Sequence, residues 1–467
     1  MLVRKSFSKC FYLVRNIHYS KSLKCEESIS NSLKELFLSD SEYNKLADHY
    51  FRINEAHRCL IIQPYVKWGP KKLDIEPKEQ LSEAIALVET LSSWAIVDTM
   101  TIPLDTLDRK FLFKSGSMDR IKEIVDNNPR ISAIFINSSL LKKSTTLILQ
   151  ENFRKPIFDR YKIVMKILKA HASSKHSKLQ VSLAELNYLR KRSEQDLIFK
   201  TYTSEALKLL FQEREQKIKA EIENLRKQRT LLRNKRSKMD YPLVAVVGYT
   251  NAGKTSIIKA LTGEKSLKPK NQLFATLDVT VHEGCLPSGM TVLYVDTVGF
   301  ITDIPTNLIE CFIATLEDAL LADVILHVED LSSKSFHYKR KHVLNILKSL
   351  GNQTNSDVSD KIFTIGNKCD LIDNTEDPNI ECMHVSAEKG IGLEKLVQEL
   401  EKFILNKTGR QKITIRVPNG GDEIRWLYKN ATILEEVPDI KNNQYILAKV
   451  IITAVNIQKF KSYFISK

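Results

Sequence analysis

The feature that most constrains this chain is a short apolar strand that runs directly into a glycine-bearing loop and then a helix. Residues 244–247 are Val-Ala-Val-Val, and an apolar helix is expected from Ser256 onward. Between them stand Gly248, Tyr249, Thr250, Asn251, Ala252, Gly253, Lys254 and Thr255, which match the phosphate-binding P-loop pattern. In such a loop backbone N–H groups surround the phosphates, Lys254 neutralises β- and γ-phosphate charge, and Thr255 ligates Mg²⁺. The sequence therefore predicts an α/β nucleotide-binding domain.

Three further short strings follow apolar strands in the order that a doubly wound nucleotide domain requires. They are Asp296-Thr297-Val298-Gly299, Asn367-Lys368-Cys369-Asp370 and Ser386-Ala387-Glu388. The first places a carboxylate near the metal and the N–H of Gly299 near a γ-phosphate. In the second, Asp370 can accept hydrogen bonds from N1–H and the exocyclic amine of guanine, whereas adenine has an acceptor at N1. Each string alone is a weak signal, but together they favour GTP over ATP.

A polar stretch at 265–272 precedes Phe274-Ala275-Thr276-Leu277-Asp278 and is expected to be a switch loop. The hydroxyl and carbonyl of Thr276 would close on Mg²⁺ and the γ-phosphate only in the triphosphate state. The predicted metal ligands are therefore Thr255, Thr276 and Asp296, and the predicted catalytic residues are Lys254, Thr276 and Gly299. Ser256 and the residues of the five strings complete the predicted GTP-binding set.

The region before the P-loop alternates between apolar strands and helical patterns, which predicts an α/β domain with a parallel sheet over 56–158. A basic loop at 66–72 carries Trp68 and is interpreted as a surface loop in preference to an RNA contact. One long helix over 159–192 and a second over 204–238 are expected to pair as a hairpin within 159–239. The nucleotide domain is expected at 240–408, followed by a small α+β domain at 409–467.

The second hairpin helix ends in a run of basic residues that contains no acid. Such a run is usually a solvated helix face, but here no interleaved glutamate neutralises it. We therefore favour contact with a phosphate backbone, with these RNA-contact candidates: Arg226, Lys227, Arg229, Arg233, Lys235, Arg236 and Lys238.

Charge and composition indicate the kind of partner, the cellular location and the structural class of the protein. The chain carries 71 basic and 56 acidic residues, a net charge of +15, which suggests a polyanionic partner. Residues 1–24 hold six basic residues and no acid, which favours a mitochondrial transit peptide, and hence the matrix, over a disordered basic tail. No apolar run is long enough to span a membrane, and the seven scattered cysteines contain no C-x-x-C pair. A monomer without structural disulfides or zinc is expected.

With these residues in hand, the chain resembles the HflX family of GTPases, in particular its mitochondrial members, over residues 59–467. The resemblance rests on GYTNAGKT at 248–255, FATLD at 274–278, DTVGF at 296–300, and LQVSLAEL at 179–186 after Asp159-Arg160. It implies an α/β P-loop GTPase domain with a mixed, mostly parallel sheet. An α/β domain with a long helical hairpin would precede this domain, and a small α+β domain would follow it.

The resemblance also implies a function: binding to the ribosome, chiefly the large subunit, subunit separation in recycling or stress, and, in mitochondria, late large-subunit assembly. The basic hairpin would then contact ribosomal RNA. The chain departs from the family at three places. The glycine-rich segment between the family's hairpin helices is replaced by residues 193–202, which contain no glycine, and residues 114–117 keep only part of a Gly-Ser-Gly-Lys pattern. The hairpin tip is therefore expected to work differently. Val279 stands where the family usually has proline, which is a minor difference.

Two expectations concern catalysis. Phe300 stands where Ras-like enzymes use glutamine to orient water, so we expect slow intrinsic hydrolysis that a ribosomal surface stimulates by ordering Thr276 and the segment after Gly299. Asn251 raises a secondary hypothesis, since related GTPases use a P-loop asparagine to help hold K⁺.

Two functions remain open from the sequence: active ribosome recycling, and GTP-gated assembly of the large subunit without splitting. A tRNA-modifying or signalling GTPase is less favoured because the sequence carries no second cluster of cysteine, histidine or paired carboxylates.

Overall fold

The structure is a computed structural model that describes residues 43, 47, 51, 56–70, 72–105, 112–193, 204–237, 241–270, 272–302, 319–353, 358–372, 382–440 and 442–465. Residues 1–55 form one compact unit and residues 56–467 form another. In the first unit Tyr43, Ala47 and Phe51 are helical and buried. The predicted transit peptide, 1–24, lies outside the described residues.

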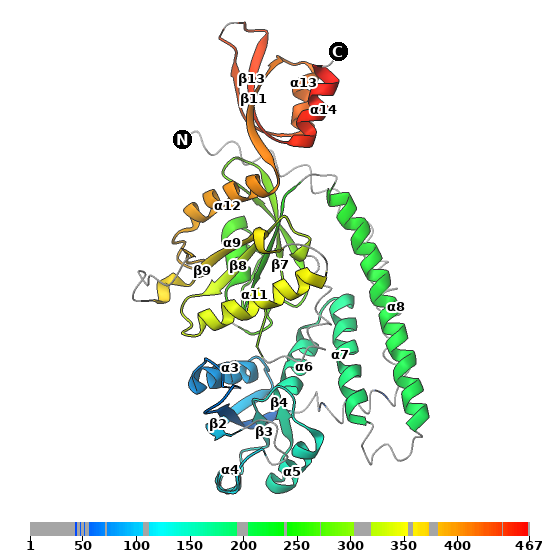
Figure 1. Cartoon of the computed structure of the whole chain (residues 1–467), viewed down its shortest axis with the longest axis vertical. Helices are drawn as coiled ribbons and strands as arrows, with labels where there is room; N and C mark the ends of the chain where they lie inside the picture. The colour runs from blue at the N-terminus through cyan, green and yellow to red at the C-terminus, as the bar shows by residue number, and fades with distance from the viewer. Residues whose placement is uncertain are drawn as a thin grey trace. The chain divides into compact units, whose positions relative to one another are not determined.

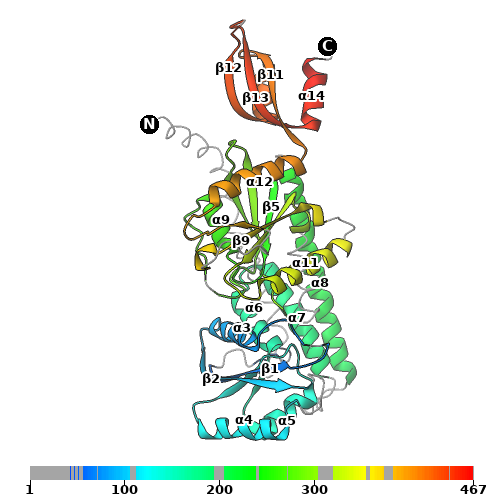
Figure 2. The same ribbon diagram turned by 60° about the vertical axis from the view of Figure 1, so that its left-hand side comes forward.

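The N-terminal part of the second unit is a four-stranded parallel sheet in the order β2-β1-β3-β4. Helices α4 and α5 cover one face, where apolar residues of β1 and β3 form a core with them, and α3 lies against the other face (Figure 2). The elements are β1 (His57–Val66), α3 (Pro77–Glu89), β2 (Trp94–Leu104), α4 (Ser115–Asn127), β3 (Ala133–Ile136), α5 (Lys143–Phe153) and β4 (Ile157–Asp159). The loop after β1 leaves Trp68 81% exposed, as a surface loop would.

The predicted helix over 159–192 is wrong as a single element, because the structure divides it into α6 (Arg160–His171) and α7 (Lys175–Ser193). The backbone leaves the helix at Ala172, and the hydroxyl of Ser174 accepts a hydrogen bond from the N–H of Ser177 at 3.1 Å, which starts the next helix. The helical pair is instead α7 with α8 (Ser204–Ser237), which pack against each other (Figure 1).

The nucleotide domain is built on a six-stranded sheet in the order β10-β9-β8-β5-β7-β6, parallel except for β6. Its central strands are apolar on both faces because helices cover both, with α9 and α12 on one side and α11 on the other (Figure 2). The elements are β5 (Leu243–Gly248), α9 (Lys254–Thr262), β6 (Thr280–Cys285), β7 (Thr291–Asp296), β8 (Val324–Asp330), α11 (Phe336–Gln353), η2 (Ser359–Lys361), β9 (Ile362–Asn367), η3 (Cys369–Leu371), β10 (Met383–His384) and α12 (Leu393–Lys407).

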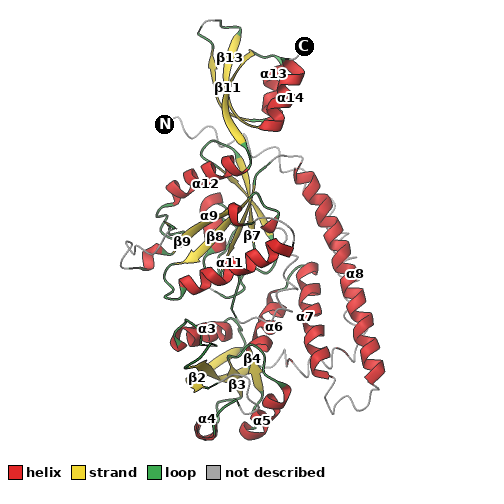
Figure 3. Cartoon of the chain, in the orientation of Figure 1, coloured by secondary structure: helices red, strands yellow, loops and turns green. Residues whose placement is uncertain are grey.

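The C-terminal part is an antiparallel sheet in the order β11-β13-β12, with two helices packed on one face (Figure 3). Its elements are β11 (Arg410–Pro418), α13 (Asp422–Asn430), β12 (Thr432–Pro438), β13 (Tyr445–Thr453) and α14 (Ala454–Phe464). The predicted α/β fold class with a P-loop domain is confirmed, whereas the division into domains at 158, 239 and 408 stays a prediction. Within the described residues, no helix has the length and apolarity needed to span a membrane.

Candidate functional site

The P-loop connects β5 to α9, and two of its glycines are required by close approach. A Cβ at Gly248 would lie 2.2 Å from the carbonyl oxygen of Val328, and a Cβ at Gly253 would lie 2.2 Å from Nδ2 of Asn367. Gly253 also has a φ of 90°, which favours glycine. Neighbouring strands therefore fix the loop where the N-terminus of α9 opens onto a cavity.

Lys254 lies inside this loop and is 7% exposed. Its Nζ donates to the carbonyl oxygens of Tyr249 at 3.0 Å and Gly248 at 3.4 Å. Burial lowers the pKa of Lys254 to about 8, against the opposing influence of the Asp296 carboxylate. A phosphate group bound in the loop would place a negative charge beside the buried Lys254 ammonium and stabilise its charged form.

The three predicted metal ligands lie together. The hydroxyl of Thr255 donates to Oδ2 of Asp296 at 2.6 Å, and the hydroxyl of Thr276 lies 3.2 Å from both. Asp296 is buried, and its Oδ1 has no hydrogen-bond partner among the described residues. Burial raises the pKa of this carboxyl despite the hydrogen bond from Thr255. A buried acceptor without a partner, beside two hydroxyls, suits a hard cation that prefers oxygen ligands.

The opposite side of the site is organised by Asn367. Its Nδ2 donates to the carbonyl of Ala252 at 2.9 Å, and its Oδ1 accepts from the N–H of Ala387 at 3.1 Å. The side chain therefore ties the P-loop to the loop after β10. Lys368 forms an ion pair with Asp330 at 2.6 Å, and Asp370, the second residue of η3, lies on the wall of the cavity.

These groups surround a cavity of about 380 Å³. Most of the predicted GTP-binding residues line it: Thr250, Asn251, Gly253, Lys254, Thr255, Ser256, Phe274, Ala275, Thr276, Gly299, Asn367, Lys368, Asp370, Ser386, Ala387 and Glu388. Pro269, Lys270, Gln272 and Leu371 also line it, and the sequence analysis did not select them. The lining does not include Gly248, Tyr249, Ala252, Leu277, Asp278, Asp296, Thr297, Val298 or Cys369.

Several of the predicted residues that do not line the cavity support it through hydrogen bonds or apolar packing. The hydroxyl of Thr297 donates to the carbonyl of Val246 at 2.7 Å, and Leu277, Val298 and Cys369 are buried apolar side chains. Their role in the described arrangement is therefore to fix the strand ends from which the cavity-lining groups project.

Asp278 points away from the cavity toward the junction of α6 and α7. Its carboxylate accepts hydrogen bonds from the N–H of Ser174 at 3.0 Å and from the hydroxyls of Ser173 and Ser174. Burial raises the pKa of Asp278, but the hydrogen bonds from the two serines outweigh burial, and the pKa is lowered overall. Nδ1 of His171 also donates to the carbonyl of Phe274 at 2.8 Å. The predicted switch loop thus contacts the helices that precede the nucleotide domain.

The segment after Gly299 pairs with the P-loop. Phe300 forms a parallel bridge with Tyr249, accepting from the N–H of Thr250 at 2.7 Å and donating to Gly248 at 3.1 Å. A Cβ at Gly299 would lie 2.8 Å from Cα of Thr250, so this backbone approaches the P-loop too closely for another residue. The side chain of Phe300 is 7% exposed and offers no group that could orient water.

Glu83, His171, Ser174 and Thr302 contact the P-loop or the switch segments, and Arg160 contacts Glu83. None of these five residues was predicted as a site residue from the sequence. Among them, only Arg160 could have been found from the sequence, because it belongs to the strings on which the family resemblance rests. The others are ordinary polar residues whose partners lie far away in the sequence.

The basic helix α8 is described only in part. Arg226 and Lys227 are exposed and Arg229 is half-buried, and Arg226 lies 3.7 Å from Glu223. The backbone of Arg233, Lys235 and Arg236 is helical, whereas Lys238 lies outside the described residues.

Known proteins resemble this chain along most of its length. Residues 243–368 match the family model described as 50S ribosome-binding GTPase, and residues 78–168 match the model described as GTP-binding GTPase N-terminal. GTP-binding protein 6 of Xenopus laevis is 37% identical over 94% of this chain and 84% of its own length. The human protein of that name is 39% identical over 88% of this chain and 81% of its own length. GTPase HflX of Caldanaerobacter subterraneus is 30% identical, over 84% of this chain and 91% of its own length.

Proposed function

This chain belongs to the HflX family of GTPases, and from that premise we propose that it acts on the mitochondrial ribosome, where it binds the large subunit and promotes subunit dissociation during recycling. The observation that carries this proposal is the contact between the switch loop and the helices before the nucleotide domain. His171 holds the carbonyl of Phe274, and Ser173 and Ser174 hold Asp278. A change in the switch loop on nucleotide exchange would therefore reach the helical region that carries the basic surface.

The chain is a GTPase, and the site suggests how its residues divide the work. The P-loop amides and Lys254 would bind the β- and γ-phosphates, and Asp370 would accept from the guanine edge. Thr255, Thr276 and Asp296 would hold Mg²⁺, which when bound offsets the negative charge that develops during phosphoryl transfer. The N–H of Gly299 would donate to a γ-phosphate oxygen.

Phe300, which stands where Ras-like enzymes use glutamine, is apolar and buried and therefore cannot orient water. We therefore propose that the free protein hydrolyses GTP slowly and that a ribosomal surface accelerates the reaction by ordering Thr276 and the segment after Gly299. A secondary proposal is that Asn251, which lines the cavity at a φ of 60°, helps hold K⁺. Equal hydrolysis rates in K⁺ and Na⁺ would remove it.

The partner surface is proposed from charge. The helix α8 presents exposed Arg226 and Lys227, and the same helix continues through Arg233, Lys235 and Arg236. Contact with large-subunit ribosomal RNA would use these cations on phosphate oxygens. The basic, acid-free residues 1–24 support delivery to the mitochondrial matrix, and we propose that the protein acts as a monomer.

The alternative function is a GTP-gated assembly factor that binds a maturing large subunit without splitting ribosomes. Both functions use the same gated RNA-binding surface. They differ in whether the bound protein overlaps the contacts between subunits, and the relatives' descriptions leave that open.

Sedimentation separates the two functions. Purified protein is incubated with intact mitochondrial ribosomes and GTP, GDP or a non-hydrolysable GTP analogue, and the particles are resolved on a sucrose gradient. Loss of monosomes that depends on GTP, with the protein on the large subunit, supports recycling. Large-subunit binding without monosome loss supports assembly, and no association in any nucleotide state would refute both.

A further inference from the structure

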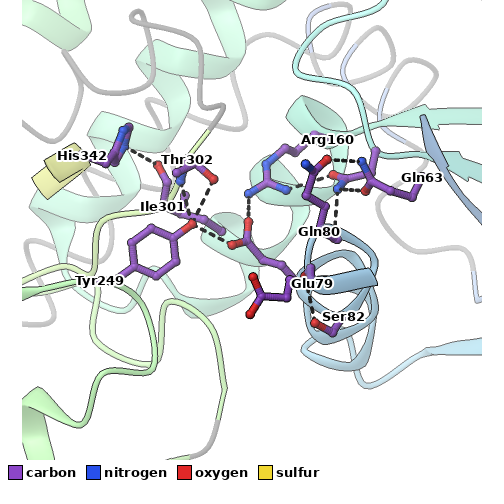
Figure 4. Close-up of polar contacts among 11 residues, drawn as sticks. Gln63, Glu79, Gln80, Ser82, Arg160, Tyr249, Ile301, Thr302 and His342 are labelled. Atoms are coloured by element: carbon purple, nitrogen blue, oxygen red, sulfur yellow. Dashed lines mark hydrogen bonds and ion pairs between the residues drawn. The ribbon is translucent and has the colours of Figure 1, made fainter. Parts of the chain in front are cut away.

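The N-terminal end of α6 is tied to the P-loop by a chain of polar contacts (Figure 4). Arg160, the first residue of α6, is 3% exposed and forms an ion pair with Glu83 of α3. Its Nη1 also donates to Oδ1 of Asn137 at 2.9 Å, where β3 ends. The guanidinium therefore holds the Glu83 carboxylate in one position against the sheet.

Glu83 in turn contacts the second residue of the P-loop. The hydroxyl of Tyr249 donates to Oε2 of Glu83 at 2.7 Å. The same tyrosine oxygen accepts from the N–H of Thr302 at 2.9 Å and lies 3.0 Å from the Thr302 hydroxyl (Figure 4). Thr302 follows Phe300 by two residues, so this contact ends the segment that pairs with the P-loop. Burial and the Glu83 charge raise the pKa of Tyr249, so the hydroxyl keeps the proton that it donates.

The C-terminal end of α6 reaches the other switch. His171 is its last residue and donates to the carbonyl of Phe274. Ser173 and Ser174 follow after Ala172 and bind Asp278. Thr276 lies between these two anchored residues. The ends of a single 12-residue helix thus hold the two segments on which hydrolysis depends.

The body of α6 is packed firmly enough to transmit a displacement. All residues from Arg160 to Leu168 are buried. Tyr161 donates to the carbonyl of Ala184 in α7 at 3.0 Å, and its ring stacks on Tyr188 with centroids 4.7 Å apart. A close-packed helix moves as a unit, so loosening one end changes the position of the other.

We propose that α6 is a strut that positions both switch segments for GTP hydrolysis, with Glu83, Arg160 and Tyr249 as positioning residues at one end and Ser174 and His171 at the other. Through it, Gly299 stays against the P-loop while Thr276 faces Asp296. The strut acts on the placement of groups around the γ-phosphate and leaves the phosphate cradle itself unchanged.

The first test separates kcat from KM in the free protein, so it does not depend on any ribosome. Tyr249→Phe removes the hydroxyl that donates to Glu83, and Glu83→Gln removes the charge that pairs with Arg160 and strengthens that hydrogen bond. Each variant is expected to lower kcat roughly ten-fold, with KM for GTP within about two-fold. The matched control is Glu79→Gln, because Glu79 lies one turn earlier on α3 and no dashed line in Figure 4 reaches its carboxylate. This control is expected to keep the parent kcat.

Unchanged kcat in Tyr249→Phe and Glu83→Gln would overturn the proposal. A rise in kcat would overturn it as well, since the contact would then restrain the switches instead of positioning them. Thermal unfolding of each variant identifies any that has lost the fold. Tyr249→Phe keeps the aromatic ring and is therefore the variant expected to disturb folding least.

The second test asks whether the two ends are coupled. Glu83→Gln at one end is combined with Asp278→Ala at the other, and kcat is measured for both single variants and the double. Independent sites multiply their effects, so two ten-fold losses would give roughly a hundred-fold loss. If α6 is already released at one end, releasing the other end should lower kcat little further. The kcat of the double variant is therefore expected within about three-fold of the kcat of the worse single variant. Multiplicative losses would refute the coupling.

Discussion

At the scale of single residues, Thr276 has the most specific role in the proposed site. Its hydroxyl lies 3.2 Å from both the Thr255 hydroxyl and Oδ2 of Asp296, although it comes from a loop and they come from the ends of regular elements. Thr276→Ala should lower single-turnover GTP hydrolysis at least ten-fold, because the loop loses the group that closes on the metal and the γ-phosphate. GDP affinity, measured by fluorescence titration, should stay within about three-fold. An equal loss of GDP affinity would show that Thr276 only supports the cavity.

We propose that base selection depends on Asp370, which lines the cavity. Asp370→Asn replaces a carboxylate that accepts twice from guanine with an amide that can donate, which suits the extra carbonyl of xanthine. Relative affinity for GTP over XTP should fall about a hundred-fold or more, as measured by competition binding. Glu394→Gln, at an exposed position on α12 outside the cavity lining, is the control. An unchanged preference would place guanine recognition elsewhere.

His327 links stability to pH. It is buried in β8, and burial together with the positive charges of Arg340 and Lys254 lowers the pKa of His327 to about 3. The folded protein keeps this ring neutral where the unfolded chain binds a proton, so the free energy of unfolding is unaffected above pH 6.5 and falls below it. Between pH 7.0 and 5.5 this group should cost about 1 kcal/mol.

Urea unfolding at the two pH values provides the measurement. His327→Gln should lose less stability between pH 7.0 and 5.5 than the parent, whereas His337→Gln, at an exposed position on α11, should behave like the parent. The same pH-dependent loss in His327→Gln would contradict the assignment.

At the scale of elements, the sequence analysis succeeded where one short segment carries its own signal and failed where structure depends on distant partners. The P-loop and the strings after β7, β9 and β10 were recognised because strand, turn and helix follow each other directly. The division between α6 and α7 was missed, although Ser173 and Ser174 are residues that commonly begin helices. Residues 160–192 contain no glycine or proline that would mark a break, and the serines are held by Asp278, which lies 104 residues away from Ser174.

The contacts of Glu83 were beyond sequence reasoning for the same reason. Its partner Tyr249 is 166 residues away, and nothing in the local pattern around either residue distinguishes a buried hydrogen bond from a solvated side chain. Tyr249 was selected as part of the P-loop pattern, but the structure gives it a contact on the side away from the cavity. Such contacts depend on how the folded parts meet.

The basic end of α8 provides a prediction at this scale. Reversing the charge of Arg226, Lys227 and Arg229 to Glu should weaken binding to large-subunit RNA and reduce the slope of log affinity against log salt by about one per lost phosphate contact. Filter binding at several salt concentrations measures both. The control reverses Lys208 and Lys217, which are exposed on the same helix outside the acid-free run. If both variants bind equally well, α8 binds no RNA through this run.

At the scale of the whole molecule, the two switch segments of this GTPase are held by residues that precede the nucleotide domain in the chain. Anything that binds the N-terminal α/β region or the helical pair can then alter hydrolysis, and nucleotide exchange can alter binding in return. The net charge of +15 suits a polyanionic partner. We propose that the ribosome is this partner and that it completes the active site.

The most direct measurement is the rate of GTP hydrolysis by the purified protein, alone and with isolated mitochondrial large or small subunits at equal concentration. We expect large subunits to raise kcat at least ten-fold, because they order Thr276 and the segment after Gly299, and small subunits to leave kcat unchanged. A rate that large subunits do not change would refute the proposal that the ribosome completes the active site.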